Sequence, residues 1–114
     1  MEIQAVDFGE ALIGGKFYDG DVLVGWDGDV EVWEKNHVFA VDELIRVLKR
    51  YPKLETLIIG RGMIGTVMLD PRVRELLEDK QVMLLLEKTE YAAEIFNAFA
   101  ARGKRVVALL HTTL

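Results

Sequence analysis

The residues most able to do chemistry in this chain form a glycine-rich loop. Gly60-Arg61-Gly62-Met63-Ile64-Gly65 matches the pattern G-x-G-x-x-G and follows a short apolar run that is typical of a buried strand. In dinucleotide-binding proteins this pattern binds a pyrophosphate. Glu87, 22 residues past Gly65, stands where a ribose-binding carboxylate would be expected. The pattern alone therefore suggests a nucleotide site.

The helix that should follow this loop is displaced. In the dinucleotide fingerprint the third glycine lies at the start of a helix whose N-terminus meets the phosphates. Here residues 66–69 intervene, and Asp70-Pro71 marks the helix start with an N-cap and a proline at the first helical position. We therefore interpret Gly60 and Gly62 as a tight loop that needs positive φ, with an anion contact near Arg61 as the alternative.

Two further segments are expected beside this loop, because the carboxyl ends of parallel strands meet at one edge of a sheet. They are Glu87–Thr89 and His111–Thr113, each of which follows a predicted strand. Arg61 could bind an anion, Thr89 could donate a hydrogen bond and His111 could exchange a proton. The alternatives are a helix N-cap for Thr89 and a histidine bonded to backbone for His111.

The remaining polar residues are weaker candidates. Asn97 falls opposite the apolar stripe of its predicted helix, so it is either a surface residue or one that clamps a neighbouring loop. The two histidines are isolated and do not have the spacing of metal ligands. The acidic residues of the turns could bind a hard cation, but acids in turns are usually solvated. We predict no metal and no cofactor. The ligand-binding candidates are Gly60, Arg61, Gly62, Thr89, Asn97 and His111.

Composition excludes several classes of protein. The 114 residues, 51% of them hydrophobic, support one domain with a packed core. Neither cysteine nor serine occurs, which excludes disulfides, thiolate metal sites and Ser or Cys nucleophiles. No apolar run approaches the roughly 20 residues of a membrane-spanning helix, and the N-terminal segment lacks the basic region of a signal peptide. We expect a cytoplasmic protein, and the few amide side chains indicate a heat-adapted source.

Charge is distributed unevenly along the chain. Residues 1–45 carry eleven acidic side chains against two lysines, whereas residues 46–114 carry twelve basic and eight acidic side chains. The net charge of −5 without a clustered basic stripe argues against nucleic-acid binding. Four cations on one predicted helix complement the dipole at its C-terminus, with a phosphate-binding patch as the alternative. They are Arg46, Lys49, Arg50 and Lys53.

The second half of the chain predicts two crossover units. Three apolar runs are typical of buried strands, at residues 56–59, 82–86 and 104–110. Helices with apolar stripes separate them, one starting at Asp70-Pro71 and one capped by Thr89, and a further helix is predicted over Asp42–Arg50. This alternation implies right-handed connections and a largely parallel sheet.

The first third predicts β structure that covers or extends this sheet. Asp27-Gly28 lies between two apolar runs and predicts a hairpin with a two-residue loop. That loop would pair Val24 with Glu31 and Val22 with Trp33. We find no internal repeat, so we expect a single α/β domain over residues 1–114.

Several segments occur in an order that resembles one family. They are Leu57–Met63, Glu87–Ala92, Phe96-Asn97, Gly103–Val106 and His111–Thr113. The family consists of small single domains and includes the adipogenesis-associated domain protein and a mitochondrial respiratory complex I assembly factor. The resemblance covers residues 55–114 and is looser over residues 1–45. It implies a three-layer α/β fold with a mixed central sheet, and it implies no reaction.

The chain departs from this family at its end. Members often finish in a His-x-Thr-Cys pattern, whereas this chain finishes His111-Thr112-Thr113-Leu114. Any role of a thiol at that position therefore cannot operate here.

Two functions are consistent with these observations. The first, by analogy with the assembly factor, is a non-enzymatic domain that binds a protein partner in assembly or regulation. Trp26, Trp33 and Phe39 would be contact points, unless they belong to the core or pack in a homodimer. The second is a small-ligand or anion binder, or an enzyme, with a cleft at Gly60–Gly65, Thr89 and His111.

Overall fold

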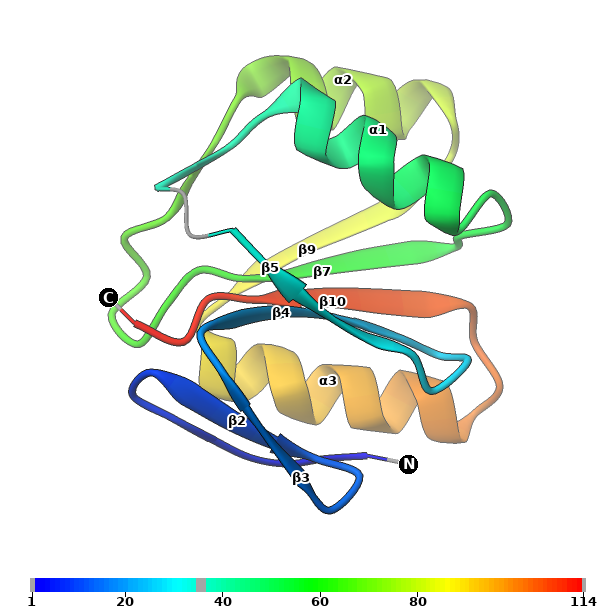
Figure 1. The fold of residues 1–114 in the computed structure, drawn as a ribbon. Coiled ribbons are helices and arrows are strands. Elements are labelled where there is room, and N and C mark those ends of the chain that lie inside the picture. The colour runs from blue at the N-terminus through cyan, green and yellow to red at the C-terminus, as the bar shows by residue number, and fades with distance from the viewer. Residues whose placement is uncertain (1, 35–36, 114) are drawn as a thin grey trace.

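The computed structural model describes residues 2–34 and 37–113, which form three layers (Figure 1). The central layer is a five-stranded sheet. Its strand order is β5 (Val30–Trp33), β4 (Asp21–Gly25), β10 (Val106–Leu110), β7 (Thr56–Gly60) and β9 (Met83–Glu87). Helices α1 (Val41–Arg50) and α2 (Pro71–Asp79) cover one face. The other face is covered by helix α3 (Thr89–Ala101) and by a meander of β1 (Ile3–Asp7), β2 (Glu10–Ile13) and β3 (Lys16–Asp19).

Strand β10 is the centre of the core. It pairs antiparallel with β4 and parallel with β7, and all five of its residues are buried. Val107 and Leu109 pack in the cluster beneath α1 and α2, whereas Val106, Ala108 and Leu110 pack in the cluster on the side of α3 and the meander. A strand with both faces covered must be apolar at every position, which explains its unbroken hydrophobic run.

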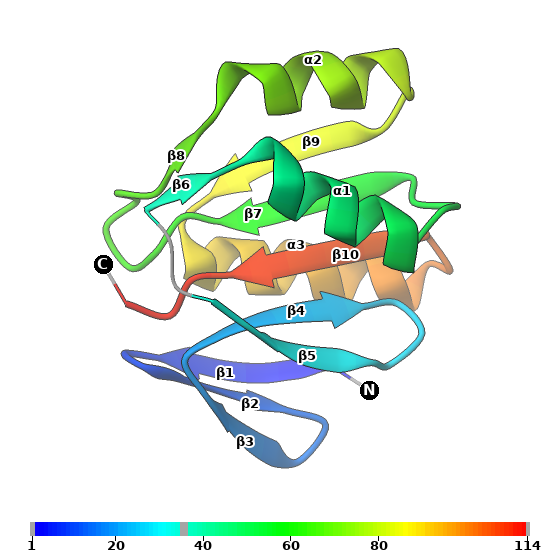
Figure 2. The ribbon, with the colours of Figure 1, turned by 45° about the horizontal axis from the view of Figure 1, so that its top comes forward.

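The predicted fold class is confirmed. Strand β7 leads through α2 to β9, which lies beside it, and β9 leads through α3 to β10 on the opposite side of β7. Because the two crossovers run in opposite directions along the sheet, right-handed connections place their helices on opposite faces. The antiparallel strands β4 and β5 make the sheet mixed (Figure 2).

The predicted register of the β4–β5 hairpin is wrong by one residue. Val24 pairs with Val30, and Asp21 pairs with Trp33. The loop has three residues instead of two: Gly25 N donates to Asp29 O at 3.0 Å, and the last loop residue, Gly28, has a φ of 89°. The shift matters because a slip of one residue exchanges the faces of a strand.

The corrected register places Trp33 in the core beneath α1, where it is 4% exposed. Its indole Nε1 donates to Glu43 Oε1 at 3.0 Å, while Glu43 Oε2 accepts a hydrogen bond from Ala40 N at 2.9 Å. Glu43 therefore satisfies the buried indole and the start of α1 together, and α1 begins at Val41.

Asp70 caps α2 as predicted. Its Oδ1 accepts a hydrogen bond from Arg72 N at 2.9 Å, and Pro71 is the first helical residue. The Arg72 side chain also bonds Asp70, so these contacts hold the pKa of that carboxyl below its ordinary value. Before each of the first two helices lies a two-residue strand, β6 (Val38–Phe39) and β8 (Met68–Leu69), and these pair in parallel.

None of the helices in the described part of the chain is long and apolar enough to cross a membrane.

Candidate functional site

Three loops meet at the carboxyl edge of the central sheet. The Thr89 hydroxyl accepts a hydrogen bond from Gly62 N at 2.9 Å and donates one to His111 O. His111 N in turn donates to Gly60 O at 3.0 Å. These four residues form one hydrogen-bonded cluster, which we call the strand-end junction.

The strand-end junction is packed. Thr89 is fully buried, and a Cβ added at Gly60 would lie 2.9 Å from Thr89 Oγ1 and 3.0 Å from Thr89 Cα. Glycine is required at position 60 because the start of α3 approaches the strand so closely. The expectation of a positive φ is wrong for Gly60, which is not one of the glycines with positive φ. It is correct for Gly62, which has a φ of 99°.

The predicted N-cap role of Thr89 is also wrong. The N-cap of α3 is Lys88, and Thr89 is the first helical residue. Its hydroxyl connects the glycine loop to the end of β10 instead of capping its own helix. The G-x-G-x-x-G loop does not open a helix either, because α2 begins only at Pro71. The loop therefore lacks the helix N-terminus on which a dinucleotide fingerprint depends.

His111 is paired with an acid that sequence reasoning missed. Its ring is buried, and Nδ1 lies 2.7 Å from Asp21 Oδ2. A carboxylate only accepts hydrogen bonds, so Nδ1 donates. Asp21 Oδ1 accepts a second bond from Thr112 N at 2.9 Å. Within the described residues, His111 Nε2 is buried without a partner.

Arg61 faces a different environment. Its Nε donates to Val67 O at 2.8 Å, and no other interaction of this side chain is seen among the described residues. It borders a cavity of about 140 Å³ whose other walls are apolar: Ile59, Val67, Met68, Leu69 and Leu86. His111 does not line this cavity, so the residue expected to bind an anion and the residue expected to exchange a proton do not share it.

Met68, which lines this cavity, is exposed, and two further exposed hydrophobic side chains lie on the paired strand and on the preceding loop. Val38 and Met68 are paired across β6 and β8 and are 49% and 65% exposed. Ile64, in the loop that leads to β8, is 61% exposed. We call Val38, Ile64 and Met68 the β6–β8 surface. Large exposed hydrophobics that gather beside a cavity mark a contact surface more often than scattered ones do.

The aromatic residues expected as partner contacts lie mostly in the core. Trp33 and Phe39 are buried, and half-buried Trp26 packs against the Tyr51 ring with the centroids 5.2 Å apart. Trp33 and Phe39 are therefore unable to serve as surface anchors for a partner. For these two residues the alternative that they belong to the core is correct.

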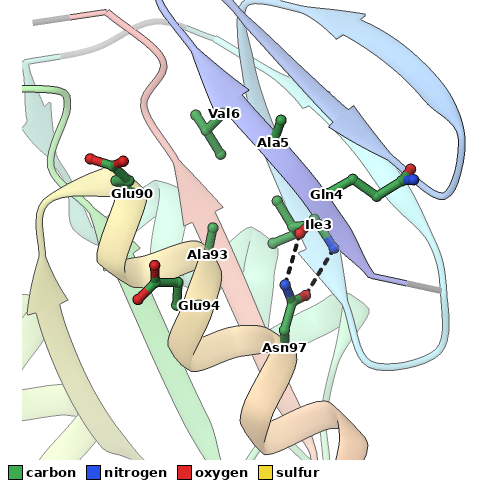
Figure 3. Close-up of a pocket in the computed structure, with 8 residues that line it drawn as sticks. All are labelled: Ile3, Gln4, Ala5, Val6, Glu90, Ala93, Glu94 and Asn97. Carbon is green, nitrogen blue, oxygen red and sulfur yellow. Dashed lines mark hydrogen bonds between the residues drawn. The ribbon is translucent and has the colours of Figure 1, made fainter.

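Asn97 lies apart from the strand-end junction. It projects from α3 toward β1, where its Oδ1 accepts from Ile3 N and its Nδ2 donates to Ile3 O, both at 2.8 Å (Figure 3). Of the two alternatives for Asn97, a surface residue or a clamp on a neighbouring loop, the contacts support the clamp. The segment that Asn97 holds is strand β1 and not a loop. Together with Ile3 it borders a second cavity, of about 300 Å³, between β1 and α3.

The acids of the first third do not gather at one site, because Asp27 and Asp29 share Arg50 whereas Asp21 pairs with His111. Arg50 Nη2 lies 3.0 Å from a carboxylate oxygen of Asp27 and of Asp29, and the Arg46 guanidinium lies 4.2 Å from the centroid of the Trp33 ring. Arg46 and Arg50 thus pack against the β4–β5 hairpin, whereas Lys53, predicted on the same helix, lies beyond its end at Arg50. No group of three or more potential metal ligands occurs within residues 2–34 and 37–113.

These features define a three-layer α/β domain of unknown function with a packed junction at the carboxyl edge of its sheet. Residues 3–111 match the model of a family described as "Protein of unknown function (DUF498/DUF598)", and the chain belongs to that family.

Solved structures share the fold. A conserved hypothetical protein from Pyrococcus horikoshii OT3 is 26% identical, with 100% of both chains covered and a TM-score of 0.84. A protein from Bartonella henselae, described as an outer membrane protein, is 24% identical over 98% of this chain and 94% of its own, with a TM-score of 0.84. A Bordetella pertussis protein described as a Mth938-like domain is 18% identical over 97% and 85%, with a TM-score of 0.70.

Proposed function

We propose that this chain is a protein-binding module that docks a partner on the β6–β8 surface. The observation that carries the proposal is the exposure of Val38, Ile64 and Met68, of which Met68 lines an apolar cavity. Burying three such side chains would remove a large apolar area from water, at about 25 cal/mol per Å² before the costs of association. A cavity beside them offers a place for one anchoring side chain of the partner.

Arg61 supports a more specific proposal for that anchor. Its guanidinium lies at the wall of the cavity, held by one bond from Nε to Val67 O. The terminal nitrogens can then bind a carboxylate in bidentate geometry. We propose that the partner inserts an aliphatic side chain and places a neighbouring carboxylate, either an acidic side chain or a C-terminus, on Arg61.

Photo-crosslinking in the native host tests this proposal. A photoreactive amino acid at Ile64 is expected to form a defined adduct, which mass spectrometry then identifies. The same amino acid at Glu75, an exposed position on α2, is the matched control and is expected to form none. Arg61→Gln is expected to reduce the Ile64 adduct strongly. Equal adducts from both positions, or an Ile64 adduct unaffected by Arg61→Gln, would count against the proposal.

A second candidate, a small-anion binder, rests on the same cavity. A volume of about 140 Å³ with one guanidinium fits a short-chain carboxylic acid better than a nucleotide. In this version the strand-end junction holds the glycine loop, and Arg61 makes the contact. Titration with hexanoate, followed by amide NMR shifts, distinguishes it. Shifts at Val67 and Leu86 that vanish in Arg61→Gln would favour the small ligand.

Relationship and location complete the proposal. We propose that the chain is related to the family that includes the complex I assembly factor, which the order of the segments between residues 57 and 113 supports. Assembly or regulation of a protein complex is then the biological setting. A cytoplasmic location and a heat-adapted source stay predictions from composition. A melting temperature below about 60 °C, an ordinary mesophile value, would remove the second.

A further inference from the structure

We propose that the free edge of β1 binds an extended, basic peptide segment by strand addition in the groove between β1 and α3. This groove is a separate site, so the proposal does not depend on the β6–β8 surface. In the part of the chain that the structure describes, strand β1 pairs with β2 along one edge and with no strand along the other. Asn97 of α3 contacts the opposite edge, beside the cavity of about 300 Å³ (Figure 3).

Asn97 occupies this edge at one residue as a neighbouring strand would. Its amide accepts from Ile3 N and donates to Ile3 O, both at 2.8 Å. This pair of bonds copies the closely spaced pair of an antiparallel ladder. The edge is therefore able to form ladder hydrogen bonds toward α3, and a side chain supplies them only at Ile3.

The next backbone groups on the same edge belong to Val6. Asp7 pairs with Glu10 across a two-residue turn, so the N–H and C=O of Asp7 face β2 and those of Val6 face away from it. Among the described residues, no hydrogen bond from α3 reaches Val6. An unpaired edge of this kind is a template for an incoming strand.

Two carboxylates determine the charge of the incoming strand. Glu90 and Glu94 line the groove from α3, both are exposed, and none of the described residues that line it is basic. Ala93 lies on the groove side of α3, where it is buried in the same cluster as Ile3 (Figure 3). A second copy of this chain would bring its own Glu90 and Glu94 against these, which like-charge repulsion opposes. The occupant is therefore a segment of another protein that carries Lys or Arg.

The spacing of the carboxylates specifies the pattern of that segment. A helix rises about 1.5 Å per residue, so Glu90 and Glu94 are separated by about 6 Å along α3. Alternate side chains of an extended strand lie about 6.6 Å apart on one face. Basic residues at positions i and i+2 of the peptide would thus each meet one carboxylate, and adjacent basic residues would not.

Amide NMR on the full chain tests the proposal. The probe is an acetylated, amidated heptapeptide of sequence Thr-Val-Lys-Val-Lys-Val-Thr. We expect the Val6 amide to shift and its exchange with solvent to slow by at least tenfold on binding. The double variant Glu90→Gln/Glu94→Gln is expected to raise the Kd about tenfold or more. Its matched control, Glu75→Gln/Glu78→Gln on the exposed face of α2, is expected to leave the Kd unchanged.

Three peptide and protein outcomes would overturn it. One is no shift at Val6 with the lysine peptide at about 1 mM, the concentration at which even a weak site fills appreciably. Another is equal affinity for a peptide in which glutamates replace the lysines, or in which the two lysines are adjacent. A third is protection of Val6 that grows with protein concentration alone, because that would make a second copy of this chain the occupant.

Discussion

The strand-end junction and the β6–β8 surface both follow strand ends at the carboxyl edge of the central sheet, but they differ in which side chains are buried and which are exposed. In the junction the polar groups are buried: Thr89 and His111 are almost inaccessible, and their polar atoms mostly bond other parts of this chain. At the β6–β8 surface the apolar groups are exposed, with Ile64 and Met68 each more than half accessible.

This difference separates residues that hold the fold from residues available to a partner. A buried polar group is satisfied internally because leaving it unpaired costs about 1–3 kcal/mol. An exposed apolar side chain gains nothing from the folded monomer and gains from contact with another molecule. We therefore expect substitutions in the junction to change the free energy of unfolding, and substitutions at the β6–β8 surface to change binding.

Removing the Asp21 carboxylate is expected to give the largest loss of stability. Asp21 accepts hydrogen bonds from His111 Nδ1 and Thr112 N, and all three groups are buried. Asp21→Ala leaves both donors without this acceptor, so we expect about 3–5 kcal/mol less free energy of unfolding in urea denaturation. Asp19→Ala, at an exposed acid of β3, is the control and should change it by under about 0.5 kcal/mol. Equal effects would show that the junction does not hold the fold.

Adding a methyl group at Gly60 is expected to cost somewhat less. The new Cβ would lie 3.0 Å from Thr89 Cα and 3.2 Å from Leu110 Cδ2, so α3 must move away from β7. We expect Gly60→Ala to reduce the free energy of unfolding by about 2–3 kcal/mol. Combining it with Thr89→Ala, which removes the atom 2.9 Å away, should give less than the sum of the single effects. Strict additivity would contradict the close approach.

Removing only the Thr89 hydroxyl is expected to have a smaller effect. Thr89→Val keeps the shape of the side chain but leaves Gly62 N and His111 O without their partner. We expect about 1–2 kcal/mol of destabilisation, and Thr89→Ser, which keeps the hydroxyl, should restore most of it. A Thr89→Val protein with unchanged stability but altered hexanoate shifts would instead make Thr89 a ligand-binding residue. Thr89 would then belong with the residues available to another molecule and not with those that hold the fold.

Much of the fold could be predicted because the second half of the chain has strong local signals. Strands β7 and β10 are continuous apolar runs, and Asp70-Pro71 fixes the start of α2. The meeting of the three loops also followed from topology, since parallel strands align their carboxyl ends. The hairpin register failed because Asp27-Gly28 signals a turn without specifying whether the loop has two or three residues.

The roles of individual site residues depended on contacts that are distant in sequence. Asp21 and His111 are 90 residues apart, and nothing local indicates that they pair. One signal was available, an acid at the start of an otherwise apolar strand, because a buried carboxylate requires a partner. Asn97 could not be placed without knowing that β1 lies against α3. The β6–β8 surface was missed because strands of two residues have no periodicity to detect.

The smallest change in stability is expected from Met68→Gln, which separates an effect on binding from an effect on folding most clearly. Met68 is 65% exposed, so replacing its thioether with an amide of similar length should alter the free energy of unfolding by less than about 0.5 kcal/mol. The amide favours contact with water, so the crosslinked adduct formed from Ile64 should fall severalfold. Asp21→Ala, assayed in the same way at a temperature where it is still folded, should retain the adduct. If Asp21→Ala abolished the adduct while Met68→Gln kept it, the partner would bind the junction and not the β6–β8 surface.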